Sequence, residues 1–315
     1  MKNFAITGVA GYIAPRHLQA IRDTGNNLIA AVDPHDSVGI IDRYFPEASF
    51  FTEFERFDRY LDKLRREDKS NSINYISICS PNHLHDAHIR HAFRLHSDAI
   101  CEKPLVIKPH NLDALQELEI EYNQRVFTIL QLRKHEKIID LKNKFKKSNK
   151  KHNIVLSYIT SRGPWYKFSW KGSYEKSGGI ATNIGVHFFD MLMWIFGKVQ
   201  RSDVHLFTET KASGFIELDN AYITWYLSID SNDLPSDSIS KGQRTFRSIT
   251  IDNQEIEFSE GFTDLHTAVY QDILNGGGNG INEARSSLEL VYNISLSKPS
   301  IDLETAHPLL LMYHK

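Results

Sequence analysis

The chain has 315 residues, a formal net charge of −2, 41% hydrophobic residues and 24% charged residues. These proportions are typical of a folded globular protein and exclude a disordered or fibrous chain. The near-neutral charge offers no general attraction to nucleic acid or to an anionic membrane. At roughly 150 residues per domain, the length favours two domains.

The sequence also lacks the marks of export. The N-terminal residues MKNFAITG have no apolar signal-peptide core. No apolar run comes near the ~18 residues of a membrane-spanning helix, so we expect no membrane insertion. The two cysteines, Cys79 and Cys101, are spaced for neither a zinc site nor a redox pair. We therefore expect a cytoplasmic protein without a metal site.

The first third of the chain alternates short β-rich runs with helix-like stretches. The first such stretch is Pro15–Thr24, and the predicted strands are Phe4–Thr7, Leu28–Val32, Asn74–Cys79 and Ala99–Cys101. This alternation predicts an α/β domain with a parallel, Rossmann-type sheet over residues 1–125. Ligands of such sheets bind beyond the carboxyl ends of the strands.

A different pattern begins near residue 125. Val126–Leu130 is predicted as a strand and Arg133 to Lys147 as a Lys-rich helix, and longer strand-like runs follow at Ile154–Thr160, Val204–Thr208, Ala221–Ile229 and Arg247–Ile251. Strands clustered after a helix predict an α+β domain over residues 126–315 with a large, mostly antiparallel sheet.

Three segments of this second part have simple structural interpretations. The basic stretch Arg133–Lys151 contains only Phe145 as an aromatic residue, so a solvated helix face is favoured over nucleic-acid binding. The polar stretch Asp230–Arg244 is predicted as an exposed loop. Gly276–Gly280 lacks the Lys-Ser/Thr of a phosphate loop and is predicted as a flexible linker.

The turn after the first predicted strand carries the strongest local signal. It reads Gly8-Val9-Ala10-Gly11-Tyr12-Ile13-Ala14, with small residues where backbone amides must approach a pyrophosphate. A tight turn without a ligand is the alternative. Asp33 ends the second strand, where its carboxylate would accept hydrogen bonds from an adenosine ribose and repel a 2′-phosphate. This favours NAD over NADP.

Two more strand ends and one helix carry polar groups. Ser80-Pro81-Asn82-His83-Leu84-His85 is either part of a ligand site or a helix-starting turn. In Glu102-Lys103-Pro104, the lysine is either an exposed residue at a strand end or a group that lies beside any bound nicotinamide. In the helical stretch Ala181–Gly197, helical spacing puts Asn183, His187 and Asp190 on one face. A structural histidine is the alternative for His187.

The order of these motifs resembles the Gfo/Idh/MocA oxidoreductase family. Glu102-Lys103-Pro104 is similar to its Glu-Lys-Pro motif, and Gly178 to His187 is similar to its Gly-Gly-x-x-x-Asp-x-Gly-x-His segment, with Asn183 at the aspartate. The resemblance implies an N-terminal NAD-binding Rossmann domain, a C-terminal α+β domain and Lys103 and His187 as catalytic residues.

Within that family, four segments resemble enzymes that oxidise the carbon-3 hydroxyl of a UDP-sugar: Gly11–His17, Cys101–Pro104, Gln131–Arg133 and Ser177–Asp190. The resemblance implies oxidation of UDP-N-acetylglucosaminuronic acid to a 3-keto sugar nucleotide for bacterial surface polysaccharide (O-antigen, lipopolysaccharide). It further implies that 2-oxoglutarate reoxidises NADH and that the protein is a homotetramer built through the second-domain sheets.

The resemblance also implies the site residues. The expected NAD-binding residues are Gly8, Gly11, Tyr12, Ile13, Asp33, Ser80, Pro81, Asn82, His83, His85, Glu102, Lys103, Gln131, Trp170 and Lys171. The expected substrate-binding residues are Lys103, Arg162, Tyr166, Asn183 and His187.

The chemistry is consistent with these roles. An imidazole ordinarily titrates near pH 6.5, so His187 suits a general base, and the Lys103 ammonium would stabilise the developing alkoxide. Arg162, Tyr166 and Lys171 are candidates for the diphosphate and carboxylate, although their loop could be a packed aromatic turn. Another sugar or cyclitol dehydrogenase, an NAD-dependent glycosidase and a non-catalytic NAD-binding sensor are the alternatives.

Overall fold

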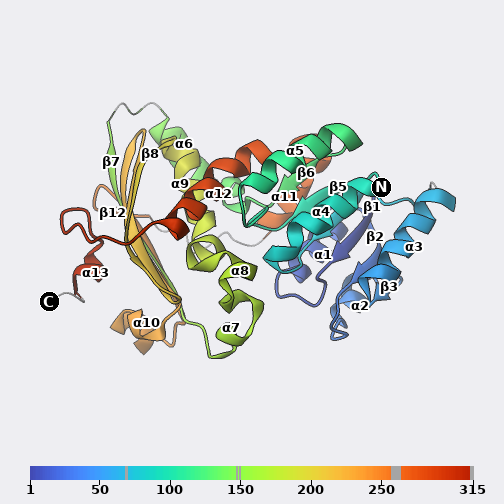
Figure 1. The fold of residues 1–315 in the computed structure, drawn as a ribbon, viewed down its shortest axis with the longest axis horizontal. Coiled ribbons are helices and arrows are strands. Elements are labelled where there is room, and N and C mark those ends of the chain that lie inside the picture. Colours follow the sequence, from blue (N-terminus) through green and yellow to red (C-terminus); the bar gives the residue numbers. More distant parts are fainter. Residues whose placement is uncertain (68–69, 147, 149, 257–263, 313–315) are drawn as a thin grey trace. The chain divides into compact units, whose positions relative to one another are not determined.

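The computed structural model describes residues 1–67, 70–146, 148, 150–256 and 264–312 (Figure 1). The chain divides into two compact units. The first contains Met1–Lys134 and Thr263–Arg285, and the second contains His135–Phe262 and Ser286–Lys315. The predicted domains are 1–125 and 126–315, so the units differ from them chiefly by a segment near residue 270.

The first unit is built on a parallel sheet. Its strands are β1 (Asn3–Thr7), β2 (Asn27–Val32), β3 (Ser49–Phe51), β4 (Tyr75–Ile78), β5 (Asp98–Cys101) and β6 (Val126–Thr128). They lie in the order β3-β2-β1-β4-β5-β6, so the order reverses between β1 and β4. This is the strand order of dinucleotide-binding folds, whose ligands bind at that reversal. The predicted α/β class is confirmed.

The helices of this unit are α1 (Ala14–Asp23), α2 (Ile40–Tyr44), α3 (Phe54–Glu67), α4 (His85–Arg94), α5 (His110–Tyr122) and α11 (Leu265–Leu274), with 3-10 turns η1 (Asn82–Leu84) and η2 (Gln131–Lys134). Helix α11 joins this unit from far along the chain. Its apolar residues Val269, Tyr270 and Ile273 are buried in one core with Leu18 and Ile21 of α1. These contacts explain why a segment expected in the second domain belongs to the first unit.

The glycine-rich stretch after α11 is a fixed turn, and its prediction as a flexible linker is wrong. The Gly278 amide donates to Asp272 Oδ2 at 3.0 Å, and the Asn279 carbonyl accepts from the Thr128 amide at 2.8 Å. Gly278 has a φ of +100°, and a Cβ there would lie 2.6 Å from the ring of Phe127. Close packing against β6 therefore requires glycine.

The second unit is built on a mixed sheet. Its strands are β7 (His152–Thr160), β8 (Val199–Phe207), β9 (Lys211–Leu218), β10 (Ala221–Ser228), β11 (Thr245–Ile251) and β12 (Gln254–Glu255), in the order β12-β11-β7-β10-β9-β8. Only β7 and β10 pair in parallel among these described strands, so the expected mostly antiparallel sheet is confirmed. Strand β9 was not predicted from the sequence. Its Gly214 weakens the strand pattern, yet a Cβ there would lie 2.8 Å from Trp225.

The helices of the second unit are α6 (Glu136–Phe145), α7 (Trp165–Phe168), α8 (Tyr174–Ser177), α9 (Val186–Phe196), α10 (Ser236–Ser240) and α13 (Pro308–Met312). Short turns η3 (Trp170–Gly172), η4 (Ala181–Gly185) and η5 (Ser231–Asp233) separate them, and α12 (Ile281–Leu296) runs from the first unit into the second. Helices α6 and α9 lie on one face of the sheet and α13 lies on the other (Figure 1). The helix predicted from Arg133 to Lys147 is interrupted at His135, whose ψ of 125° is extended.

One helical stretch is long and apolar enough to cross a membrane, contrary to the expectation that none would come near that length. It spans Tyr174–Phe196, and 72% of its most apolar window is buried inside the structure. Phe189 packs edge-on against Trp225 of β10, with ring centroids 5.3 Å apart. A Cβ on Gly185 would lie 2.7 Å from Leu227. The stretch is therefore the core helical segment of the second unit.

The segment 230–244 is not the wholly exposed loop that its polarity predicts. It contains η5 and α10, and its Asp233 is only 7% exposed. The Asp233 carboxylate accepts hydrogen bonds from Lys211 Nζ at 2.7 Å and from the Tyr226 hydroxyl at 3.0 Å. A buried polar side chain of this kind has satisfied partners.

Candidate active site

The turn between β1 and α1 has the form that a pyrophosphate requires. Gly8 has a φ of +77°, and a Cβ there would lie 2.6 Å from the Cys79 carbonyl group and the Ser80 nitrogen. Any other residue would therefore push apart the ends of β1 and β4. The turn closes through hydrogen bonds from the Gly11 amide to the Gly8 carbonyl (3.0 Å) and from the Ala14 amide to the Gly11 carbonyl (3.1 Å). It leads directly into the N-terminus of α1, a favourable position for an anion.

Asp33 lies beside this turn at the end of β2. Its Oδ2 accepts from the Ala10 amide at 3.0 Å, and its Oδ1 accepts from the His35 amide at 2.9 Å. Asp33 is 6% exposed. One hydrogen bond from the glycine-rich turn and one from the turn that follows Asp33 hold its carboxylate in one orientation. The remaining lone pairs suit ribose hydroxyls. These residues fit NAD, whose adenosine ribose carries no 2′-phosphate.

We expect Asp33→Ala to narrow the preference for NAD over NADP by about tenfold or more, because the carboxylate repels a 2′-phosphate a few ångströms away. Titration calorimetry with both cofactors measures the ratio of dissociation constants. Asp33→Asn is the matched control for the hydrogen bonds, since it keeps one acceptor oxygen and loses the charge. Equal affinity of the wild type for the two cofactors would contradict the assignment.

The end of β4 is tied to the end of β5. The segment Ser80-Pro81-Asn82-His83 enters the 3-10 turn η1 and then α4, so the helix-starting interpretation describes its backbone. His85 is 1% exposed, and its ring contacts the carbonyl oxygens of Ser80 (Nε2, 2.9 Å) and Pro104 (Nδ1, 2.7 Å). Ser80 Oγ lies 2.9 Å from Nδ1 of His88. His85 is thus a structural link between two strand ends, and no direct contact with a ligand is needed to explain it.

Lys103 follows β5 directly and is partly buried. The peptide bond from Lys103 to Pro104 is cis. Glu102 is 6% exposed and accepts hydrogen bonds from His17 and His266, each at 3.0 Å. Burial on its own raises the pKa of a carboxyl group, but these two partners hold the pKa of Glu102 well below its usual range. The Glu-Lys-Pro segment therefore carries a buried, charged carboxylate beside its lysine.

The predicted helix around His187 begins with a wider turn than the α-helix that its pattern predicts. Residues Ala181–Gly185 form a π-helix, and α9 begins at Val186. Such turns are frequent at functional sites. The Asn183 side-chain amide donates to the Tyr166 hydroxyl at 2.6 Å, so two predicted substrate residues are brought together. Burial raises the pKa of Tyr166.

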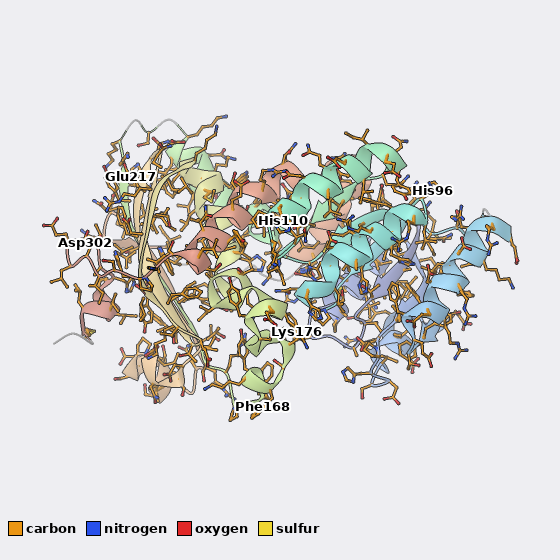
Figure 2. The ribbon with its side chains drawn as sticks, viewed as in Figure 1. His96, His110, Phe168, Lys176, Glu217 and Asp302 are labelled. Carbon is orange, nitrogen blue, oxygen red and sulfur yellow. The ribbon has the colours of Figure 1, made fainter. Side chains whose placement is uncertain are left out.

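The loop before this helix is only partly a packed aromatic turn. Tyr166 is 5% exposed, whereas Trp165 and Phe168 are 53% and 91% exposed, and Figure 2 shows Phe168 at the surface. The Lys171 ammonium lies 3.8 Å from the centre of the Trp170 ring, a cation–π contact. The loop therefore combines one packed tyrosine with two exposed aromatic side chains.

The expected site residues divide between the two units. The first contains Gly8, Gly11, Tyr12, Ile13, Asp33, Ser80, Pro81, Asn82, His83, His85, Glu102, Lys103 and Gln131, all in turns that follow strands of its sheet or at the start of a helix. The second contains Arg162, Tyr166, Trp170, Lys171, Asn183 and His187. Tyr12 is 92% exposed.

Sequence reasoning missed the partners of Glu102. His17 and His266 donate to the carboxylate, the Tyr270 hydroxyl lies 2.7 Å from the other nitrogen of His17, and all three residues are 0–3% exposed. His17 belongs to one of the segments that carried the resemblance, but no role followed from its position. His266 lies more than 160 residues from Glu102 in the chain, and no local pattern indicates their contact.

Comparisons with known proteins agree with this geometry. Residues 2–130 match the model of the oxidoreductase family with an NAD-binding Rossmann fold, and residues 152–234 match that of its C-terminal alpha/beta domain. The chain is similar to the WlbA (WbpB) dehydrogenase of Thermus thermophilus. The structure of the Thermus protein in complex with NAD and α-ketoglutarate is 48% identical in sequence to this chain, with a TM-score of 0.94. The match covers 98% of this chain and 99% of that one.

A second structure of the Thermus protein, with NAD and UDP-GlcNAcA, has 47% identity and a TM-score of 0.93 over 98% of this chain and 99% of that one. The WlbA dehydrogenase of Bordetella pertussis shares the fold at 17% identity, with a TM-score of 0.76 over 96% and 98% of the two chains. Family models that match most of the chain establish its family. The chain belongs to the Gfo/Idh/MocA family of NAD-binding oxidoreductases.

Proposed function

We propose that the protein oxidises the carbon-3 hydroxyl of UDP-N-acetylglucosaminuronic acid to a 3-keto sugar nucleotide, which is the activity of a UDP-N-acetyl-2-amino-2-deoxy-D-glucuronate 3-dehydrogenase. One observation carries the proposal: nearly half of all residues are shared, end to end, with the Thermus dehydrogenase that was crystallised with NAD and this sugar nucleotide. The Rossmann turn and the Asp33 carboxylate of this chain fit the same cofactor.

Two side chains act on the reacting hydroxyl in this proposal. NAD, when bound, supplies the acceptor for the hydride that leaves carbon 3. His187 takes the proton of the carbon-3 hydroxyl as general base. The Lys103 ammonium stabilises the negative charge that develops on that oxygen and orients the reacting hydroxyl. Loss of the proton and of the hydride leaves a carbonyl at carbon 3.

The substrate carries a diphosphate and a carboxylate, which need cations and hydrogen-bond donors. We assign these groups to Arg162 and Lys171 together with the Tyr166–Asn183 pair, which the 2.6 Å hydrogen bond holds in one arrangement. Asn183 donates where the family motif has an aspartate, so this position supplies an amide and no carboxylate. Tyr166 and Asn183 therefore position the sugar and leave proton transfer to His187.

The finer features of the proposal concern the cell and the assembly. We assign NAD binding to a domain of residues 1–125 and substrate binding and tetramer formation to residues 126–315. Oxidation of NADH by 2-oxoglutarate between turnovers is supported by the α-ketoglutarate bound to the Thermus relative. Cys79 and Cys101 are buried and unpaired with each other, in keeping with a reduced cytoplasm, where surface-polysaccharide precursors are made.

The test is turnover with a panel of substrates. The purified protein is incubated with NAD and UDP-N-acetylglucosaminuronic acid, UDP-N-acetylglucosamine, free N-acetylglucosamine or myo-inositol, with and without 2-oxoglutarate, and the products are weighed by mass spectrometry. Of the four substrates, we expect only UDP-N-acetylglucosaminuronic acid to give a product that is lighter by two hydrogen atoms. Preferred oxidation of a free sugar or cyclitol would replace this substrate assignment, and binding of NAD without any turnover would leave the protein as a sensor.

A further inference from the structure

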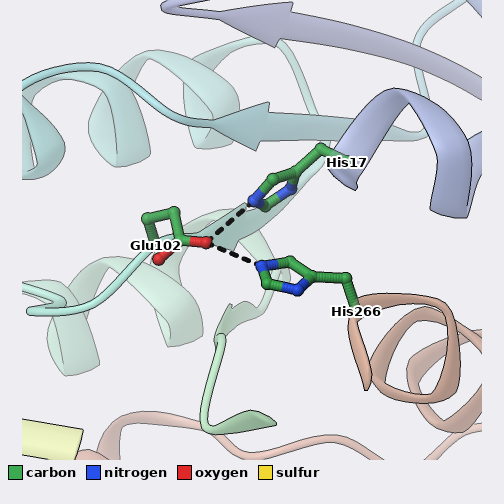
Figure 3. A group of neighbouring side chains, drawn as sticks. All are labelled: His17, Glu102 and His266. Carbon is green, nitrogen blue, oxygen red and sulfur yellow. Dashed lines mark hydrogen bonds and ion pairs between the residues drawn. The ribbon is translucent and has the colours of Figure 1, made fainter. Parts of the chain in front are cut away.

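Both neighbours of Lys103 in the chain are held by buried histidines. On one side, Nε2 of His17 and Nε2 of His266 lie 3.0 Å from the same oxygen of Glu102. Figure 3 shows the two rings reaching this oxygen from α1 and α11. On the other side, Nδ1 of His85 lies 2.7 Å from the carbonyl oxygen of Pro104. We call His17, His85 and His266 the histidine clamp.

Two buried hydroxyl groups hold the His17 ring of the clamp in place. The Tyr270 hydroxyl lies 2.7 Å from Nδ1 of His17 and 2.7 Å from Ser77 Oγ on β4. His17 donates through Nε2 to the carboxylate, so its Nδ1 accepts from Tyr270, whose oxygen accepts in turn from Ser77. Tyr270 and Ser77 are completely buried. The orientation of the His17 ring is therefore determined by the core and cannot follow movements of the surface.

The carboxylate also reaches the lysine itself. The Lys103 amide donates to Glu102 Oε2 at 3.2 Å, while Oε1 accepts from both histidines. Burial lowers the pKa of His17, which favours its neutral ring, while hydrogen bonds from the two histidines hold the pKa of Glu102 well below its usual range against the effect of burial. Hydrogen bonds to a buried carboxylate are strong because the surroundings screen little.

We propose that the histidine clamp positions Lys103 for catalysis by immobilising Glu102 and Pro104 on either side of it. The clamp joins the lysine to α1, whose N-terminus closes the glycine-rich turn, so one rigid cluster sets both the lysine and the cofactor turn of the first unit. His17, His85 and His266 are positioning residues, since they act through the backbone of the Glu-Lys-Pro segment. The inference rests on the proposed function for its kinetic part only.

A bound metal ion is the competing use of these side chains. The ligand atoms of His17, Glu102 and His266 lie within 4.8 Å of one another and are buried, as zinc ligands often are. The clamp is favoured because both nitrogens already lie at hydrogen-bond distance from the carboxylate and the Tyr270 hydroxyl completes His17. Among the described residues this network leaves only Nδ1 of His266 without a partner, and it pairs Glu102 and His17 without a cation.

The experiment compares His266→Phe with a matched control, His91→Phe. His91 is another buried histidine of the first unit, and its Nε2 bonds the Asp58 carboxylate at 2.7 Å. For both His91 and His266, Nδ1 has no partner among the described residues. His266→Gln is the conservative rescue, since its amide can still donate to Glu102. Glu102→Gln is the second variant. It keeps the shape of the side chain but places an NH2 group, which cannot accept a hydrogen bond, against the backbone N–H of Lys103.

Two measurements are made on each variant. One is kcat and KM with saturating NAD; the other is the NMR signal of the Lys103 amine after reductive ¹³C-methylation, assigned with Lys103→Arg. We expect His266→Phe and Glu102→Gln to lower kcat by about 10- to 100-fold, as misplacement of a catalytic group by about 1 Å can, and to shift the Lys103 signal. His266→Gln should restore both. His91→Phe should lower only the melting temperature.

Two results would overturn the clamp. One is an unchanged Lys103 signal in folded His266→Phe and in Glu102→Gln. The other is one equivalent of zinc in the purified wild type that His266→Phe loses, measured by elemental mass spectrometry. Absence of turnover of the UDP-uronic acid by the wild type refutes the proposed function instead, and the Lys103 signal still decides the clamp.

Discussion

Replacing Lys103 with methionine is expected to lower single-turnover NADH formation by about 10²–10³-fold, which is the usual effect of removing one donor that stabilises an oxyanion. Methionine keeps the length and the apolar stem of lysine, so the fold and NAD binding should survive. An exposed lysine at the end of a strand would behave differently, because surface substitutions usually change stability by no more than about 0.5 kcal/mol. The assay uses UDP-N-acetylglucosaminuronic acid, with a thermal melt of the same sample.

Lys108→Met is the matched control for this experiment. Lys108 is exposed and lies in the same connection between β5 and α5. It should leave the rate of NADH formation unchanged. A loss of tenfold or less in Lys103→Met, with an unchanged melt, would place Lys103 outside the chemistry and remove the proposed dehydrogenase mechanism.

Replacing His187 with asparagine is expected to abolish most turnover while NAD still binds, since general base catalysis typically contributes 10²–10⁴-fold. His187 lies in the first turn of α9, directly after the π-helical turn that carries Asn183. The measurement is kcat at saturating NAD and substrate, with NAD affinity from calorimetry.

His205→Asn on β8 controls for the loss of any histidine from the second unit. His205 is 2% exposed and lies 3.3 Å from Thr305 Oγ1, so its replacement tests structural damage alone. A His187→Asn enzyme that works at nearly the wild-type rate would show that His187 is a structural histidine.

The first sheet could be predicted from the sequence because its strands end at strong local signals. Gly8 and the Asp33-Pro34 pair stop β1 and β2, and the same residues belong to the candidate NAD site. These signals depend on backbone conformation within a few residues, so they are visible without a structure. The same holds for Lys103 at the end of β5.

The partners of Glu102, strand β9 and the burial of Asp233 could not be predicted, because they depend on contacts between distant parts of the chain. His266 reaches Glu102 only because α11 packs on α1, and nothing near residue 266 indicates that neighbour. Strand β9 was missed because its Gly214 is required by the close approach of the Asp203 carbonyl on β8 and of Trp225 on β10. The buried Asp233 likewise looked like a loop residue until its partners on β9 and β10 were known. Local pattern therefore predicted the candidate catalytic groups but not the residues that support them.

The late position of α11 in the chain has a consequence for synthesis on the ribosome. Growing chains emerge from the N-terminus, and an N-terminal domain can usually fold as soon as its last strand is out. Here all six strands of the parallel sheet are complete at Thr128, yet Val269, Tyr270 and Ile273 arrive only after the whole mixed sheet has been made. Until then, Leu18 and Ile21 lack the apolar cover that α11 provides, and Glu102 lacks His266. The nascent Rossmann sheet therefore remains incompletely covered while the ribosome translates nearly half of the chain, and during this interval it exposes the most apolar surface to a chaperone.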